Sequence, residues 1–201
     1  MTTTTVLALV ATVAIVVALV FLVRLHTAPT GLDPTRDAVS AYGISAYHLW
    51  YRAMVLTIGA GALVLTAALA TLGAVPAGGL AALAVYGAAR LAIAPFPTDP
   101  EDATPTTAGR LHVLFAVTGF LAIAVAAPII SGALAELAGW RGIGGLLRVL
   151  GVLVSVTCAL VLAAGLLPRL RPRFGAFQRA FYVAGQAWLL VVAIRLAWPG
   201  A

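Results

Sequence analysis

The chain has 201 residues, of which 63% are hydrophobic and 9% are charged, and its mean hydropathy is +1.09. A soluble domain carries roughly 25% charged residues, so this composition excludes a water-soluble protein and predicts a single integral-membrane domain over residues 1–201. The net charge of +6 comes from arginines that flank apolar segments, so it indicates membrane orientation and not nucleic-acid binding. A single cysteine, Cys158, excludes an internal disulfide and a Cys-rich metal centre.

Six apolar segments approach the length of about 20 residues that a membrane-spanning helix needs. They cover residues 6–23, 47–72, 77–95, 110–130, 146–167 and 178–198. The first segment has no basic residue before it and Arg24 after it, which is the reverse of a cleavable signal peptide, so we expect a retained helix. The sequence therefore predicts an all-α, polytopic transmembrane bundle of six helices.

The arginines are distributed unevenly between the two sides of this bundle. Loops 24–46, 96–109 and 168–177 must share one face, and nine of the twelve arginines lie near them. The other three are Arg141, Arg148 and Arg195. Cytoplasmic loops carry the excess of basic residues, so we expect these three loops inside the cell and both termini outside, with the protein in the inner (plasma) membrane. Trp50 and Tyr51, at the start of the second segment, are expected to anchor it at the interface.

Several polar residues should lie at one depth near the cytoplasmic face. An ionisable side chain inside a membrane costs about 2.5–3.5 kcal/mol and is a functional candidate for that reason. Side chains four residues apart share a helix face, and the 96–109 loop joins the third segment to the fourth. We therefore predict one cavity lined by His48, Arg52, Arg90, Asp99, Arg110 and His112. Within it, Arg90 and Asp99 should form an ion pair.

Each of these residues also has a purely structural interpretation. The arginines could extend to lipid phosphates, and the two histidines could hydrogen-bond at the interface. Gln186 lies in the middle of the last segment, where its amide requires a hydrogen-bond partner on a neighbouring helix.

The run from the third to the fourth segment resembles a known family. Its residues Arg90, Phe96-Pro97-Thr98-Asp99, Thr107, Gly109 and His112 are similar to the signature of DUF998, a family of multi-spanning prokaryotic membrane proteins. The resemblance implies a six-helix bundle in which Arg90, Asp99 and His112 act as a unit, and it implies no activity. A more distant similarity connects the chain to the Frag1/DRAM/Sfk1 group of membrane proteins.

Three functions are compatible with these residues. The first is binding of a lipid headgroup or a small anionic ligand, because arginines form forked hydrogen bonds with phosphate. The second is a membrane-embedded enzyme acting on a lipid, in which His48 and His112 serve as acid and base or join Asp99 around a divalent metal. The third is a haem protein with both histidines as axial ligands.

We favour the first function because it requires the fewest assumptions. It implies no cofactor and no resident metal, and it makes membrane lipids the main partners. A second copy of the chain, or another membrane protein, remains open as a further partner.

Overall fold

The computed structural model describes residues 1–198, which form six α-helices and three short 3₁₀ helices. The α-helices are α1 (Thr3–Thr27), α2 (His48–Ala70), α3 (Ala77–Ala92), α4 (Thr107–Glu136), α5 (Gly144–Leu166) and α6 (Phe174–Ala197). The 3₁₀ helices are η1 (Val39–Ile44), η2 (Ala138–Trp140) and η3 (Arg171–Arg173). The predicted all-α class is confirmed, and one α-helix lies at each of the six predicted segments.

Five of the α-helices are long and apolar enough to cross a membrane, and α3 is the exception. It has 16 residues, which corresponds to about 24 Å at the usual helical rise, whereas the hydrocarbon core of a bilayer is about 30 Å thick. The chain is therefore a multi-pass membrane protein in which α3 is the shortest of the apolar helices.

Helix α4 extends beyond its predicted bounds of 110–130 at both ends. It begins at Thr107 because the hydroxyl of Thr106 accepts a 3.0 Å hydrogen bond from the backbone N–H of Gly109 and caps the first turn. It continues through Pro128 to Glu136. Proline inside a membrane helix is tolerated where neighbouring groups satisfy the freed backbone atoms.

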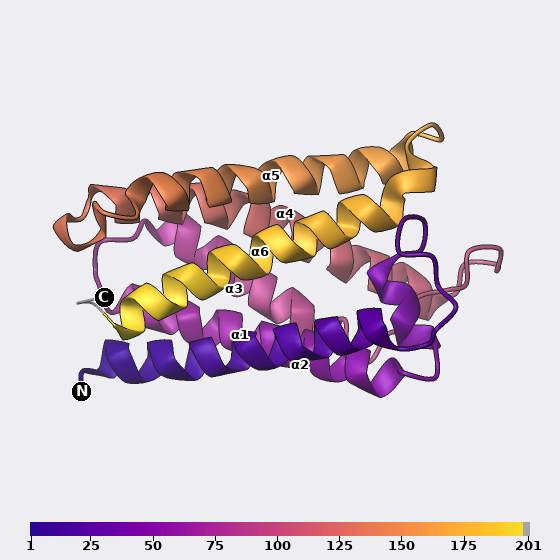
Figure 1. The fold of residues 1–201 in the computed structure, drawn as a ribbon, viewed down its shortest axis with the longest axis horizontal. Helices are drawn as coiled ribbons and strands as arrows, with labels where there is room; N and C mark the ends of the chain where they lie inside the picture. Colours follow the sequence, from indigo (N-terminus) through magenta and orange to yellow (C-terminus); the bar gives the residue numbers. More distant parts are fainter. Residues whose placement is uncertain (199–201) are drawn as a thin grey trace.

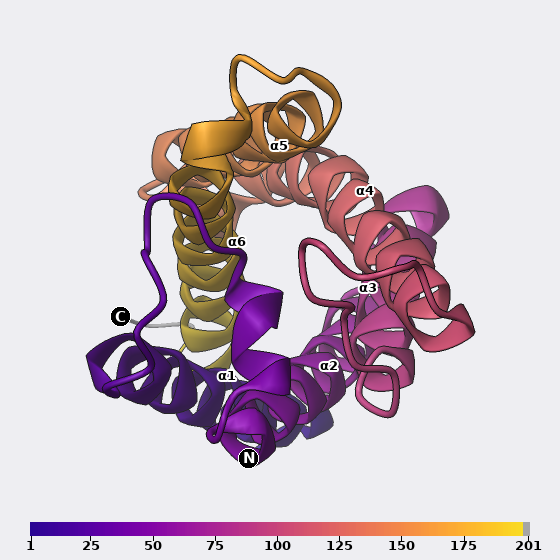
Figure 2. The ribbon, with the colours of Figure 1, turned by 90° about the vertical axis from the view of Figure 1, so that its right-hand side faces the viewer.

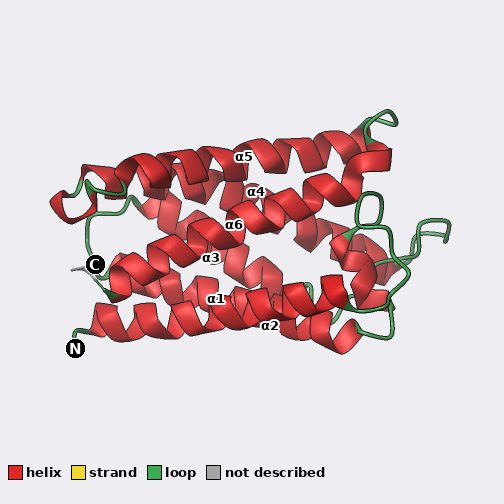
Figure 3. Ribbon diagram, viewed as in Figure 1, coloured by secondary structure: helices red, strands yellow, loops and turns green. Residues whose placement is uncertain are grey.

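The six α-helices form a closed ring. Each one packs against the next in sequence, and α6 packs against α1. Figure 2 shows this ring from one end. The start of α1 and the end of α6 lie together at one end of the bundle, and the connections 28–47, 93–106 and 167–173 lie at the other (Figures 1 and 3). We call this second end the loop end. As predicted, these three connections share one end of the bundle, and nine of the twelve arginines lie in or near them.

Helices α2 and α3 approach each other through glycine. A Cβ placed on Gly87 would lie 2.9 Å from the carbonyl oxygen of Gly59 and 2.8 Å from Cγ of Leu63. Real Cβ atoms essentially never come this close, so the two backbones touch at a point where only hydrogen fits. Small residues at helix interfaces allow such close packing in membranes.

The connection between α1 and α2 is more ordered than the predicted loop 24–46. The N–H of Val39, at the start of η1, donates to Oε1 of Gln178 on α6 (2.6 Å). Arg179 Nη1 donates to the carbonyl of Asp37 (2.7 Å). The side chains of Val39 and Tyr42 are buried. As a result, η1 lies across the loop end and forms part of the site described next (Figure 2).

Candidate functional site

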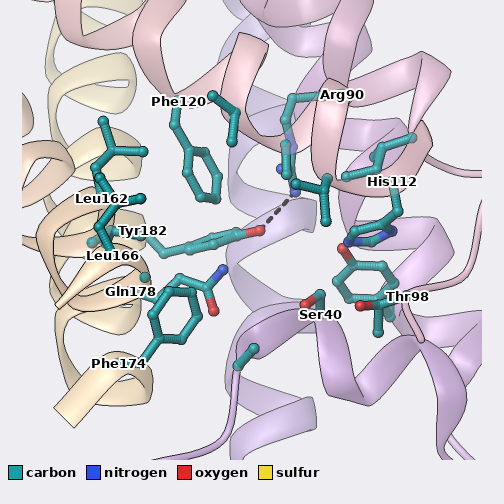
Figure 4. A pocket seen from close by; sticks show the side chains of 18 residues that line it. Ser40, Arg90, Thr98, His112, Phe120, Leu162, Leu166, Phe174, Gln178 and Tyr182 are labelled. Carbon is teal, nitrogen blue, oxygen red and sulfur yellow. Dashed lines mark hydrogen bonds between the residues drawn. The ribbon is translucent and has the colours of Figure 1, made fainter. Parts of the chain in front are cut away.

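A cavity of about 550 Å³ lies inside the ring at its loop end. Its size is typical of sites for small molecules, about 300–1,000 Å³. Polar lining residues come from η1, the 93–106 connection and helices α2, α3, α4 and α6; they are Ser40, Tyr51, Arg90, Thr98, His112, Gln178 and Tyr182. Apolar lining residues from α4 and α5 are Val113, Ala116, Val117, Phe120, Val161, Leu162 and Leu166. In Figure 4, Leu162 and Leu166 lie across the cavity from Arg90, His112 and Thr98.

Arg90 is the charged group of this cavity. Its side chain is only 1% exposed. Its Nη2 donates a 2.8 Å hydrogen bond to the hydroxyl of Tyr182, drawn as a dashed line in Figure 4. Its guanidinium carbon lies 5.4 Å from the centre of the Tyr182 ring, within the range of cation–π attraction. A Cβ on Gly119 would be 3.7 Å from Arg90 Cδ, so this glycine of α4 leaves room for the arginine side chain.

Arg90 takes part in neither of the two ion pairs formed within residues 1–198, which are Arg148–Glu136 and Arg171–Glu101. Its Nε has no hydrogen-bond partner among those residues. Buried charges in proteins are normally paired because desolvation is costly. The guanidinium is therefore held by a neutral phenol, and its charge is not balanced by a carboxylate of the described chain.

The predicted ion pair between Arg90 and Asp99 is wrong. Asp99 instead accepts two hydrogen bonds from Thr106, one from its backbone N–H (2.9 Å) and one from its hydroxyl (2.7 Å). The carboxylate thus closes the 93–106 connection onto the start of α4. These hydrogen bonds favour the ionised form and lower the pKa of Asp99 below its ordinary value. Asp99 lines a second, neighbouring pocket of about 520 Å³ and not the cavity that contains Arg90.

His112 is the second predicted residue that reaches the cavity. It is 3% exposed, and its Nδ1 donates to the carbonyl oxygen of Phe96 (2.8 Å). This bond ties the first turns of α4 to the chain just after α3 and orients the ring. In a neutral imidazole whose Nδ1 carries the proton, Nε2 is an acceptor.

The structure brings together two of the six predicted residues, Arg90 and His112. His48, Arg52 and Arg110 are exposed and line neither pocket. His48 and Arg52 do occupy one stripe of α2, but the stripe that packs inward is the one containing Tyr51, Met54 and Ile58. This inward face buries apolar surface against α1 and α3, so the charged face is turned outward.

The arrangements expected for a metalloenzyme or a haem protein are not assembled. Among residues 1–198, no group of three or more His, Cys, Asp or Glu side chains is placed to hold a metal ion. His48 is exposed whereas His112 is buried in the cavity wall, so the two rings do not share a site.

Sequence reasoning missed the tyrosines and the glutamine of the site. Tyr51 is not an interfacial anchor, because it is 4% exposed and lines the cavity. Gln178, Tyr182 and Gln186 are buried and follow one another at four-residue spacing along α6. That polar stripe was visible in the sequence and could have identified the inward face of α6. The amide of Gln186, expected to pair between helices, has no hydrogen-bond partner within residues 1–198.

Together these features define a multi-pass membrane protein with an arginine-centred cavity at one end of a helical ring. The chain belongs to the DUF998 family, described as "Protein of unknown function", whose sequence profile matches residues 9–195. The match confirms the resemblance noted over Arg90 to His112, and it includes every residue that lines the cavity. No curated protein and no solved structure matches the chain.

Proposed function

We propose that this protein binds an anionic group, a phosphate or carboxylate of a lipid headgroup or of a small ligand, at Arg90. One observation carries the proposal: a guanidinium that is 1% exposed lines a cavity and is not paired with a carboxylate of residues 1–198. Arginine presents planar, forked donors that match phosphate and carboxylate oxygens. An anion in the cavity would balance the buried charge.

The surroundings of Arg90 suit such a ligand. The hydroxyls of Tyr51 and Tyr182 and the amide of Gln178 line the same cavity and supply neutral hydrogen-bonding groups. Arg90 lies two residues before the end of α3, close to the loop end.

Orientation is part of the proposal. All six α-helices would cross the inner (plasma) membrane, with the loop end in the cytoplasm and both termini outside, because nine of the twelve arginines lie near the loop end. A short helix such as α3 is accommodated by local thinning of the bilayer. A reporter active only in the cytoplasm should work in the 167–173 connection and fail at the C-terminus. The opposite pattern would reverse the assignment.

Binding is tested by native mass spectrometry with phosphatidylglycerol, phosphatidylcholine and inorganic phosphate as separate probes. Wild-type protein should retain an anionic probe in preference to phosphatidylcholine. A hydrogen bond to a charged group contributes about 1.5–3 kcal/mol, so Arg90→Gln should weaken retention by about 10- to 100-fold. Arg52→Gln and Arg110→Gln remove exposed arginines outside the cavity and are the matched controls. Equal retention by wild type and Arg90→Gln would refute the proposal.

A stability measurement separates loss of binding from misfolding. Removing one partner of a buried ion pair costs about 3–5 kcal/mol because the other charge is left uncompensated, whereas replacing the whole pair by apolar residues of similar volume is often neutral or stabilising. Because Arg90 lacks a carboxylate partner among the described residues, Arg90→Met should keep or raise the melting temperature in the absence of added anion. A large decrease would indicate a structural role for the charge.

A further inference from the structure

Helices α4 and α5 are in tight contact over the half of the bundle away from the loop end. The hydroxyl of Ser155 donates to the carbonyl of Ala124 (2.7 Å). A Cβ on Gly151 would lie 3.1 Å from both the carbonyl oxygen of Ala127 and Cα of Pro128. One turn closer to the loop end, Sγ of Cys158 is still 3.5 Å from the carbonyl oxygen of Phe120.

Beyond Cys158 the two helices separate. Gly165 follows Gly151 by 14 residues, which is about four helical turns, so both glycines lie on the same face of α5. A Cβ on Gly165, however, would have only Phe174 within 4 Å, at 3.8 Å, and no atom of α4. In Figures 1 and 2, α4 diverges from α5 toward the loop end.

The cavity occupies the space between the separated helices. Its apolar wall is formed there by residues of α4 and α5, and two of these residues are also open to the outside: Val113 is 57% exposed and Leu166 is 81% exposed. The cavity therefore has an apolar opening on the side of the bundle, where a membrane protein faces lipid chains. Its polar wall, with the buried Arg90, lies opposite.

We infer that the ligand is an amphiphile that enters from the membrane between α4 and α5, placing its anionic group beside Arg90 and its alkyl chain between the two helices. This inference rests on the proposed function and narrows its ligand class. A small soluble anion would use the arginine but leave the apolar wall without a partner. An alkyl chain covers that wall, and the lateral opening lets the anionic group reach Arg90 without the chain leaving the lipid.

The test uses a hexadecyl phosphate that carries a photoreactive diazirine in the middle of its chain. The probe is added to the full-length protein in nanodiscs of phosphatidylcholine, and attachment sites are mapped by peptide mass spectrometry. Any lipid-like probe labels the outer surface, so the readout is the labelling that Arg90→Gln removes. We expect this labelling on residues 113–117 of α4 and 161–166 of α5.

Two tryptophan substitutions test the opening from its two sides. Leu162→Trp and Val113→Trp enlarge side chains of the cavity wall and should reduce the Arg90-dependent labelling to the level of Arg90→Gln. Their controls, Leu160→Trp and Leu114→Trp, enlarge exposed side chains of the same helices outside the cavity lining and should leave it unchanged. The melting temperature of each variant shows that it folds. The same loss of labelling from substitutions on two different helices would show that the effect does not come from a local distortion at one position.

The outcomes distinguish this inference from the proposed function. Arg90-dependent labelling that lies elsewhere, or that survives both cavity substitutions, would overturn the lateral opening and leave anion binding intact. Arg90-dependent binding of inorganic phosphate without Arg90-dependent probe labelling would identify a small free anion and also overturn the inference. Labelling and phosphate binding that are both indifferent to Arg90→Gln would refute the proposed function itself.

Discussion

Replacing Gly87 by alanine is expected to lower the thermal stability of the detergent-solubilised protein, whereas replacing Gly78 by alanine in the same helix is not. The new methyl group at position 87 would press against the backbone of α2 at Gly59, and backbone cannot rotate away. Overpacking of this kind costs about 1–3 kcal/mol. Position 78 has nothing within 4 Å of an added Cβ, so there the better helix propensity of alanine should prevail.

This substitution should also affect the site. Arg90 follows Gly87 by one helical turn, and a Cβ on Gly59 would lie 3.1 Å from Cβ of Arg90. A shift of α3 away from α2 would move the guanidinium relative to Tyr182. Melting temperatures of the two alanine variants measure the loss of stability, at about 2–4 °C per kcal/mol for a protein of this size. Anion retention measures the displacement of Arg90. Equal melting temperatures for Gly87→Ala and Gly78→Ala would show that the contact between α2 and α3 can relax.

Replacing Gly109 by alanine is the second change with a large expected effect. The added Cβ would overlap the carboxylate of Asp99, whose more distant oxygen, Oδ1, would be only 2.8 Å away. Asp99 must then leave Thr106, and the 93–106 connection loses the two hydrogen bonds that hold it on α4. We expect a lower melting temperature than for wild type. Gly132→Ala, in the same helix with nothing within 4 Å of its Cβ, is the control and should not lower it.

The pH dependence of the lower melting temperature expected for Gly109→Ala identifies its cause. The hydrogen bonds from Thr106 lower the pKa of Asp99 in the folded protein below its ordinary value of 3.8. The stabilisation from the ionised carboxylate is therefore fully present above the ordinary pKa, and it is lost as the pH falls through the lowered folded value. The melting-temperature difference between wild type and Gly109→Ala should narrow below about pH 4. A difference that stays constant with pH would mean that steric crowding, and not loss of the Asp99 bonds, causes the effect.

The sequence predicted the helices well because the relevant signals are local. An apolar run has to match the thickness of the bilayer, and the arginines that flank it mark its ends. The ordered segment η1 escaped prediction because its contacts are distant in sequence: Val39 is bonded to Gln178, 139 residues away. Neither a hydropathy profile nor a local motif reports such a contact.

For the site, the sequence predicted which residues lie near one another along the chain but not their partners or directions. Arg90 and His112 reach one cavity because the 93–106 connection joins the end of α3, which carries Arg90, to the start of α4, which carries His112. Whether Asp99 bonds to Arg90 or to Thr106 depends on the path of the 93–106 connection. Residue spacing does not determine that path. The stripe of His48 and Arg52 was identified correctly, but the direction it faces follows from how α2 packs between its neighbours.

The ring arrangement has a consequence for how the protein is made. Each helix from α1 to α5 can pack against the next helix as soon as that helix has been synthesised. The contact between α1 and α6, in contrast, requires the whole chain. Arg90 depends on the same late event, because its hydrogen-bond partner Tyr182 follows it by 92 residues. At typical translation rates of about 5–20 residues per second, this interval is roughly 5–20 s. Until α6 is made, Arg90 lacks the phenol that holds it in the finished ring. Under the proposed function, an anionic lipid would bind Arg90 during this time.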